Sequence, residues 1–309
     1  MESRIIGGSQ AIRDVLSLIE KVAPSDVTVL ITGESGTGKE MVAETIVRSG
    51  PRHGKPFVKL NCAAIPSELL ESQMFGHERG AFTGAVSRSE GCFERANHGV
   101  LLLDEIADMS LVTQTKVLRV LQEQEFERIG GKETLRVDVR ILAATNKDLL
   151  EEIRRGRFRE DLYYRLNVVE IRIPPLRDRM EDLQPLVNFF LETFSQKYRK
   201  SALKIDEAGY RTLRDHDWPG NVRELRNIVE RAVVLSRSDL IGPKDFPEKL
   251  RERSSMATGM LNEEQILTLV EMEKMYVRKV LDFTGGNKLQ AARLLDIDPK
   301  TLRTKLGNG

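Results

Sequence analysis

Apolar residues in the first half of the chain gather in short runs that lack the strict alternation of a half-exposed strand. Five runs are strand candidates: VTVLIT (27–32), PFVKLN (56–61), VLLLDE (100–105), VRILAAT (139–145) and VVEIRI (168–173). The first, third and fourth are mostly apolar, as strands covered on both faces should be. Segments with helical periodicity lie between the runs. The pattern predicts an α/β core in which helices sandwich a parallel sheet.

The strand signal stops from about Asp182 to Leu250, where LQPLVNFFLETFSQKY and NVRELRNIVERAVVL have purely helical patterns. RERSSMATGM is polar and reads as a linker, and only helical patterns follow it. We therefore expect four parts, which are an α/β core (1–180), a helical lid (181–250), a linker (251–262) and a small helical module (263–309).

Size and charge narrow the class of protein. With 309 residues there is room for about two domains, and 40% hydrophobic and 31% charged residues are typical of a soluble globular chain. The net charge of +1 argues against a globally basic protein, so any nucleic-acid contact must be regional. Cys62 and Cys92 are too few for a disulfide framework, which predicts inert thiols in a reducing compartment. Without a signal-like segment or a long apolar run, we expect a cytoplasmic protein and no membrane partner.

A glycine-rich loop follows the first strand candidate. The sequence GESGTGKE (33–40) fits the phosphate-loop pattern G-x-x-x-x-G-K, and a helical segment follows it. Such a loop directs backbone N–H groups at phosphate oxygens, and its lysine reaches the outer phosphates. The alternative is a plain glycine-rich turn. The predicted nucleotide-binding residues here are Gly33, Glu34, Ser35, Gly36, Thr37, Gly38, Lys39 and Glu40.

Glu40 stands where a Mg²⁺-binding Ser or Thr is usual, so the metal must depend more on a second acidic site. Asp104 and Glu105 end the third strand candidate and supply that site. We assign Asp104 to Mg²⁺ and Glu105 to the attacking water as general base, while a pair of helix-capping acids is the alternative. Asn146, at the end of the fourth candidate, could sense the γ-phosphate of ATP.

Six motifs in this order resemble the bacterial enhancer-binding proteins, AAA+ ATPases that activate RNA polymerase carrying sigma-54. The motifs are GESGTGKE (33–40), FGHERGAFTGA (75–85), LLLDE (101–105), FREDLYYRLNVVEI (158–171), PPLRDR (174–179) and WPGNVREL (218–225). The likeness covers roughly residues 4–250, and Glu40 is the usual residue of this family. The resemblance implies an AAA+ P-loop parallel sheet with a helical lid, ATP hydrolysis with Mg²⁺, and assembly into a hexamer or heptamer ring.

The resemblance also implies roles for four further residues. Arg159 and Arg165 match candidate fingers that reach the ATP of a neighbouring subunit, whereas the residues alone equally allow ion pairs on the subunit's own surface. Arg223 matches the lid arginine that reads the nucleotide of its own subunit. Asn61 matches an asparagine that can hold Glu105 away from the water.

The hexapeptide GAFTGA (80–85) places an aromatic residue between glycines, in a stretch too flexible to join a core. Either Phe82 is a chance surface aromatic or it is presented to a partner. In the family that the motifs resemble, this segment forms the tip of a mobile loop, and its Phe and Thr contact sigma-54. The resemblance assigns that contact to Phe82 and Thr83.

The segment GGNKLQAARLLDIDPKTLRTKL (285–306) predicts two short helices, the second begun by Asp298 and Pro299. Its spacing resembles a Fis-type helix-turn-helix, with Asp296 at the turn position that is usually glycine. A positive excess suits phosphate contacts, and a dimerisation module without DNA is the alternative. The segment 263–283 is expected to pair with its copy. The predicted DNA-binding residues are Lys300, Thr301, Arg303, Thr304 and Lys305.

Together these features predict a transcription activator that binds enhancer DNA and uses ATP to open promoters held by sigma-54 RNA polymerase holoenzyme. The first rival is a DNA-binding regulator of ordinary promoters with a subordinate ATPase. The second is a generic AAA+ remodeller, which would lack the hexapeptide and the C-terminal module. Because the ATPase pattern begins almost at residue 1, we expect signal sensing to lie on a separate protein or on a segment removed from the N-terminus.

Overall fold

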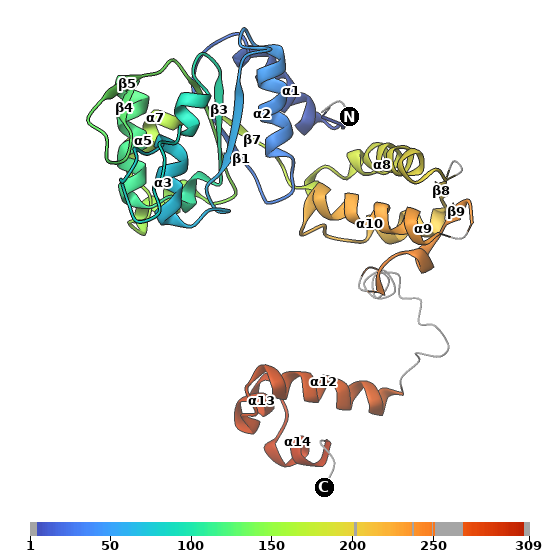
Figure 1. Cartoon of the computed structure of the whole chain (residues 1–309). Coiled ribbons are helices and arrows are strands. Elements are labelled where there is room, and N and C mark those ends of the chain that lie inside the picture. Colours follow the sequence, from blue (N-terminus) through green and yellow to red (C-terminus); the bar gives the residue numbers. More distant parts are fainter. Residues whose placement is uncertain (1–4, 201–202, 237, 249, 251–267, 306–309) are drawn as a thin grey trace. The chain divides into compact units, whose positions relative to one another are not determined.

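The computed structural model describes residues 5–200, 203–236, 238–248, 250 and 268–305 (Figure 1). The chain divides into two compact units, residues 1–250 and 251–309. The predicted linker 251–262 lies outside the described residues. Within the part of the chain that is described, every helix is too short or too polar to cross a membrane.

The first unit contains a five-stranded sheet with the order β2-β3-β6-β1-β7. Its strands are β1 (Val29–Thr32), β2 (Phe57–Asn61), β3 (Val100–Asp104), β6 (Arg140–Thr145) and β7 (Val169–Arg172). All four neighbouring pairs are parallel. The five predicted strands and the α/β class are therefore confirmed, and the carboxyl ends of all strands meet at one edge of the sheet.

Alternate strand residues enter two different cores, which explains the continuous apolar runs. Val100 and Leu102 pack in the core that includes residues of α1 (Gln10–Val22) and α2 (Lys39–Ser49). Leu101 and Leu103 pack in the opposite core. The helices and short elements that complete this region are α3 (Ser67–Phe75), α4 (Cys92–Arg95), η1 (Ile106–Asp108), α5 (Leu111–Glu123), α6 (Leu149–Arg154) and α7 (Glu160–Leu166). A separate hairpin is formed by β4 (Glu125–Glu127) and β5 (Thr134–Arg136).

The lid follows the short helices η2 (Leu176–Asp178) and η3 (Met180–Asp182). Its main helices are α8 (Leu183–Tyr198), α9 (Glu207–Arg214) and α10 (Asn221–Leu235), followed by η4 (Pro243–Asp245). Trp218 is fully buried at the centre of the lid core. The expectation that strands stop at Asp182 is wrong in one detail, because β8 (Lys204–Ile205) pairs with β9 (Leu240–Ile241). Two-residue strands are too short to produce an apolar run in the sequence.

The second unit contains α12 (Leu269–Phe283), α13 (Lys288–Leu294) and α14 (Pro299–Lys305). Its small core is formed by Val277, Ala291, Ala292 and Leu302. Asp298 accepts a hydrogen bond from the backbone N–H of Lys300 (2.7 Å), as expected for the start of the second helix. Asp296 takes the left-handed conformation (φ 51°) that its position in the turn requires. The predicted all-α helix-turn-helix is confirmed.

Candidate functional site

The carboxyl edge of the sheet brings together three motifs that lie far apart in the sequence. The glycine-rich loop follows β1, Asp104 ends β3, and Asn146 follows β6. The backbone N–H of Gly33 donates to the carbonyl of Thr145 (3.3 Å), so the start of the loop is fixed to the neighbouring strand. The predicted phosphate loop, acidic pair and polar sensor therefore share one site.

The glycine-rich loop curls tightly before α2 begins at Lys39. Gly36 (φ 80°) and Gly38 (φ 108°) adopt left-handed conformations that favour glycine. The side chain of Lys39 is 7% exposed and donates to the carbonyl of Gly33 (2.9 Å). Its ammonium lies 3.6 Å from a carboxylate oxygen of Glu105. A buried cation beside a helix N-terminus and a carboxylate is suited to hold phosphate.

Asp104 and Glu105 are adjacent at the carboxyl end of β3, and their carboxylates contact different partners. Glu105 has a left-handed backbone (φ 51°), and its carboxylate accepts a hydrogen bond from the backbone N–H of Asn146 (3.1 Å). Burial and the adjacent charge of Glu105 raise the pKa of Asp104, and the charge of Lys39 opposes them. The site thus holds two carboxylates close together at an electrostatic cost, which a cation would relieve.

Asn61 is placed differently from the expectation. Its side-chain N–H donates to Asp104 (3.2 Å) rather than to Glu105. Its side-chain oxygen accepts from the backbone N–H groups of Ala63 and Ala64 (both 3.0 Å), because the chain turns directly after β2. These contacts make Asn61 a partner of Asp104 in this conformation.

The side chains of Glu34 and Glu40 are both paired with residues outside the loop. Glu34 is bonded to Arg177 (2.9 and 2.5 Å) and to Asn221 (3.1 Å), and these bonds lower its pKa to about 2. Glu40 accepts from Lys59 (2.7 Å) on β2. The carboxylates of the loop therefore make contacts within the protein.

Arg223 joins the lid to the phosphate loop. Its guanidinium donates to the side-chain oxygen of Ser35 (3.0 Å), and its backbone N–H donates to the carbonyl of Gly36 (3.2 Å). Arg223 thus lies beside the phosphate loop of its own subunit.

Sequence reasoning missed an apolar cavity of about 290 Å³ between the core and the lid. Ile6, Val42, Phe190 and Val222 line it, together with Thr37 and Gly38 of the loop. The buried Arg179 also lines it, and the Nε of Arg179 has no hydrogen-bond partner among the described residues. No local pattern in the sequence marks this cavity, because its walls come from segments that are widely separated.

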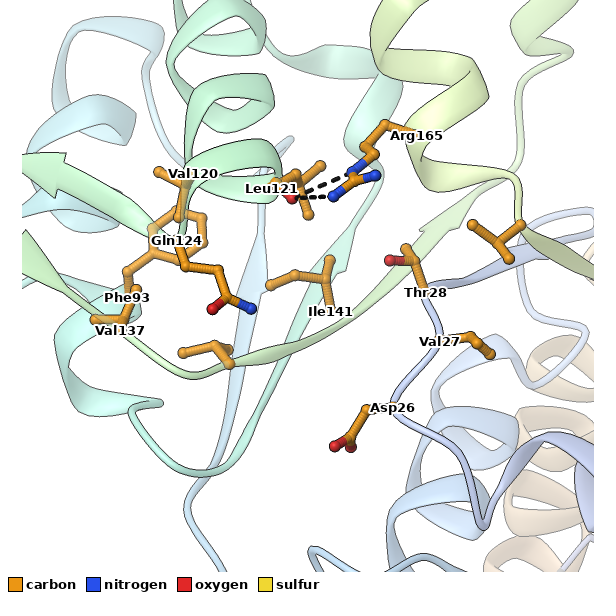
Figure 2. Close-up of a pocket in the computed structure, with 12 residues that line it drawn as sticks. Asp26, Val27, Thr28, Phe93, Val120, Leu121, Gln124, Val137, Ile141 and Arg165 are labelled. Carbon is orange, nitrogen blue, oxygen red and sulfur yellow. Dashed lines mark hydrogen bonds between the residues drawn. The ribbon is translucent and has the colours of Figure 1, made fainter.

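Arg159 and Arg165 lie on or beside α7 and make contacts within the subunit. Arg159 forms an ion pair with Asp161 (2.6 Å). Arg165 donates two hydrogen bonds (3.1 and 2.8 Å) to the carbonyl of Leu121, which Figure 2 shows as dashed lines. Arg165 borders a pocket of about 250 Å³ whose other walls include Val27 and Thr28. These two residues precede β1, so Arg165 lies at the amino edge of the sheet, opposite the phosphate loop.

The hexapeptide forms a closed turn on the surface. The backbone N–H of Gly80 donates to Ala85 (2.8 Å), and Phe82 is 38% exposed with its ring 5.0 Å from that of His77. A Cβ added to Gly130, in the β4–β5 loop, would lie 2.8 Å from the Cβ of Ala81. The two loops therefore touch, and Thr83 is exposed at the tip.

A buried arginine holds the base of this loop. Arg128 pairs with Glu78 (2.8 Å) and with Glu94 (2.5 Å), and these bonds raise its pKa further above the usual range. The side chain of Arg128 is 3% exposed and its charge is paired, so it fixes the base of the loop to α4.

In the second unit, Lys300 and Thr301 are exposed on α14. The side chains of the other predicted DNA-binding residues, Arg303, Thr304 and Lys305, lie outside the described residues. Leu294, at the end of α13, is 59% exposed. The small side chains of Ala291 and Ala292 let the helices approach closely, so Leu294 is not needed in that core.

Comparison with known families covers nearly the whole chain. Residues 5–172 match the Sigma-54 interaction domain, residues 177–261 match an AAA+ ATPase lid domain, and residues 268–308 match the bacterial regulatory protein, Fis family. The first two matches cover five of the six motifs in full and the end of PPLRDR (174–179), and the third covers the segment that predicted a Fis-type helix-turn-helix.

Similar proteins agree with these families. Transcriptional regulatory protein ZraR of Klebsiella oxytoca is 50% identical over 302 residues, which cover 98% of this chain and 68% of ZraR. Regulatory protein AtoC of Escherichia coli (strain K12) is 47% identical over 307 residues, which cover 98% of this chain and 67% of AtoC. The crystal structure of NtrX from Brucella abortus in complex with ATP has a TM-score of 0.78 and 36% identity, covering 98% of this chain and 69% of NtrX.

A sigma-54 interaction domain and a Fis-type domain in one chain imply RNA polymerase and DNA as its partners. The AAA+ domain binds ATP. The chain belongs to the sigma-54-dependent transcriptional activators, in which an AAA+ ATPase is joined to a Fis-type DNA-binding domain.

Proposed function

We propose that ATP is hydrolysed at the carboxyl edge of the sheet, with Glu105 as general base and Lys39 on the phosphates. The observation that supports this most is the meeting of Lys39, Glu105 and Asn146 from three separate motifs, with Lys39 3.6 Å from Glu105. The carboxylate of Glu105 takes the proton of the water as the water oxygen bonds to the γ-phosphorus, and the bond from the γ-phosphorus to the bridging oxygen breaks, which releases ADP and phosphate. Lys39 stabilises negative charge on the outer phosphates, and Asn146 orients Glu105 through its backbone N–H.

We propose Asp104 as the residue that holds Mg²⁺. The raised pKa of Asp104 and the proximity of a second carboxylate fit a hard cation with oxygen ligands. When bound with ATP, Mg²⁺ would neutralise charge on the phosphates. Among the described residues, no group of three His, Cys, Asp or Glu side chains could hold a metal, so phosphate oxygens and water would complete the ligand set. Asn61 keeps the carboxylate of Asp104 oriented through its amide.

We propose the apolar cavity beside the loop as the place of the adenine base. Thr37 and Gly38 belong both to this cavity and to the phosphate loop, so a nucleotide can extend from one to the other. Its walls come from the core and from the lid, which fits a base held between them. Bound nucleotide would thus fix the lid, with Arg223, against the core.

We propose that Arg165 serves the ATP site of a neighbouring copy, so that the active form is a ring. Arg165 lies at the amino edge of the sheet, and the four residues of β1 alone span about 13 Å toward the phosphate loop. The arginine therefore cannot serve its own phosphate loop without a rearrangement of α7. Arg159, near the start of the same helix, is proposed for the same interface. Two-subunit sites of this kind make hydrolysis depend on assembly.

We propose that the hexapeptide contacts sigma-54 through Phe82 and Thr83 and so transmits the effect of ATP hydrolysis to it. Both residues are exposed, and the loop has no group that could bind phosphate or a metal. The contacts of Ala81 with Gly130 and of Glu78 with Arg128 hold this loop close to the body in the present conformation. Breaking those contacts would let the tip extend toward a partner.

We propose that the second unit binds enhancer DNA through α14 and pairs with its copy through α12. An exposed apolar stripe at helical spacing on α12 supports the pairing, namely Met272, Met275, Tyr276 and Phe283. Lys300 and Thr301 are exposed on the predicted recognition helix. A dimer would present two such helices to the two halves of an enhancer site.

The test of the whole assignment is Thr83→Ala, with Ser87→Ala as control, because Ser87 is an exposed hydroxyl just outside the hexapeptide. We expect Thr83→Ala to keep ATP turnover near wild type and to abolish binding to sigma-54 and promoter opening by the purified holoenzyme. Ser87→Ala should behave as wild type in all three assays. Normal promoter opening by Thr83→Ala, or loss of its ATP turnover, would contradict the proposed division between motor and output.

A further inference from the structure

The phosphate loop is bound from outside by two segments that lie far from it in the sequence. One is η2 with the residues that follow it, and the other is the start of α10. Three successive carbonyl groups of the loop accept hydrogen bonds from them. Asn221 donates to Ser35 (3.1 Å), the backbone of Arg223 donates to Gly36 (3.2 Å), and Arg179 donates to Thr37 (3.1 Å).

These outward carbonyls matter for phosphate binding. In a loop that cradles an anion, the N–H groups point inward, which requires the carbonyls to point outward. The donors of the lid and of η2 therefore stabilise the conformation in which the loop is ready to bind. The loop and the lid cannot rearrange independently while these bonds exist.

Glu34 is the anchor of this arrangement. Both of its carboxylate oxygens receive bonds from the guanidinium of Arg177 (2.9 and 2.5 Å), in the two-pronged geometry that carboxylates favour. One of the two oxygens also accepts from Asn221 (3.1 Å). This carboxylate belongs to the second residue of the phosphate-loop motif, yet its partners belong to the lid and to the segment before it.

Asn221 connects all three parts. It is fully buried, has a left-handed backbone (φ 52°), and accepts a hydrogen bond from the backbone N–H of Leu176 (2.8 Å). Its amide N–H group donates to both Glu34 and Ser35. The side chain of Asn221, the first residue of α10, thus contacts both η2 and the phosphate loop.

We infer that Glu34, Arg177 and Asn221 form a clamp that positions the phosphate loop and the lid as one unit, so that ATP affinity depends on an ion pair outside the catalytic residues. Arg177 and Asn221 are positioning residues, since they act on the nucleotide through Glu34 and the loop carbonyls. The clamp links phosphate binding to the placement of Arg223, because any ligand that favours one loop shape also favours the attached lid position. This inference rests on the proposed role of the loop in phosphate binding.

The experiment is a double-mutant cycle with Glu34→Gln, Arg177→Met and the two combined. The control is Lys197→Met, which removes an exposed ion pair with Glu230 (2.7 Å) that ties α8 to α10 within the same lid. Affinity for a fluorescent ATP analogue, the melting temperature, and hydrogen exchange of the first turns of α10 with and without the analogue are measured on the full chain. ATP turnover at saturating ATP is measured in parallel.

Each clamp variant should weaken nucleotide binding about tenfold, and the double variant should weaken it no further, because both substitutions break the same contact. Nucleotide should no longer protect the start of α10 from exchange, while the turnover of Arg177→Met at saturating ATP stays near wild type. Lys197→Met should leave affinity and protection unchanged. Arg177→Lys keeps the charge without the two-pronged contact, so its nucleotide affinity should lie between those of wild type and Arg177→Met. If Arg177→Met unfolds the chain, Arg177→Lys takes its place in the cycle.

Two results would overturn the clamp. The first is a double variant whose loss of affinity equals the product of the single losses. The second is that the clamp variants lower the melting temperature as much as Lys197→Met does, while nucleotide still binds with wild-type affinity and still protects the start of α10 from hydrogen exchange. Lys39→Ala separates this failure from failure of the phosphate site, because unchanged affinity in Lys39→Ala would instead contradict the proposed role of the loop.

Discussion

Gly36→Ala tests how closely the phosphate loop is packed against the lid. Gly36 has φ 80°, and a Cβ built there would overlap the carbonyl oxygen of Gly220 and lie 3.0 Å from the Cβ of Arg223. Gly54 is the matched control, because it has φ 77° and a Cβ there would meet nothing within 4 Å. Both alanines bear the strain of a left-handed backbone, and only Gly36→Ala also forces the lid away.

The left-handed conformation costs an alanine about 1 kcal/mol. Overlap with a backbone carbonyl that cannot rotate away adds about 1–3 kcal/mol, as in overpacked cores. For a domain of this size, each kcal/mol lowers the melting temperature by about 2–4 °C. We therefore expect a loss of about 3 °C for Gly54→Ala and of about 6–12 °C for Gly36→Ala.

Thermal unfolding of the two variants by calorimetry measures the difference, and titration with an ATP analogue shows its consequence. Gly36→Ala should bind nucleotide more weakly, since relief of the overlap moves either the loop or α10, whereas Gly54→Ala should bind as wild type. Equal melting temperatures for the two variants, with equal nucleotide affinity, would refute the close contact between the loop and the lid.

Three further outcomes are expected. Glu105→Gln should bind ATP nearly as wild type while turnover falls strongly, because an amide cannot take the proton of the water; turnover near wild type would remove Glu105 from the role of base. Mixing Arg165→Ala with Lys39→Ala subunits should restore part of the hydrolysis, since one interface can combine the intact residue of each, and no recovery in assembled mixtures would argue against a shared site. The ion pair of Glu34 should stabilise the fold fully above pH 4.5 and lose its effect as pH falls toward about 2. Glu34→Gln should therefore make the melting temperature fall less steeply with pH in that window. A melting temperature that depends on pH as in wild type would show that Glu34 is not paired.

The sheet and its motifs could be predicted because their signals are local. A strand buried on both faces needs a continuous apolar run, and a phosphate loop needs glycines and a lysine at fixed spacing. Since parallel strands share one carboxyl edge, placing Lys39, Asp104 and Asn146 at the ends of three strands was enough to predict that they meet.

Contacts between distant segments could not be predicted in this way. Glu34 counted as a nucleotide-binding residue by its place in the motif, yet its partner Arg177 is 143 positions away. Asn61 was expected to hold Glu105 and instead contacts Asp104, because the choice between two adjacent carboxylates depends on side-chain geometry that no spacing encodes. The apolar cavity likewise exists only once the lid is folded against the core.

The positions of the arginines explain why hydrolysis and assembly are coupled in the proposed mechanism. Arg223 lies beside the phosphate loop of its own subunit, whereas Arg165 lies at the opposite edge of the sheet. In the proposed mechanism, a single subunit would bind ATP and fix its lid with its own Lys39 and Arg223. The further cation beside the γ-phosphate would come from Arg165 of a neighbour that presents its amino edge. Because the clamp at Glu34 fixes the lid to the loop, the surface that such a neighbour meets depends on whether nucleotide is bound.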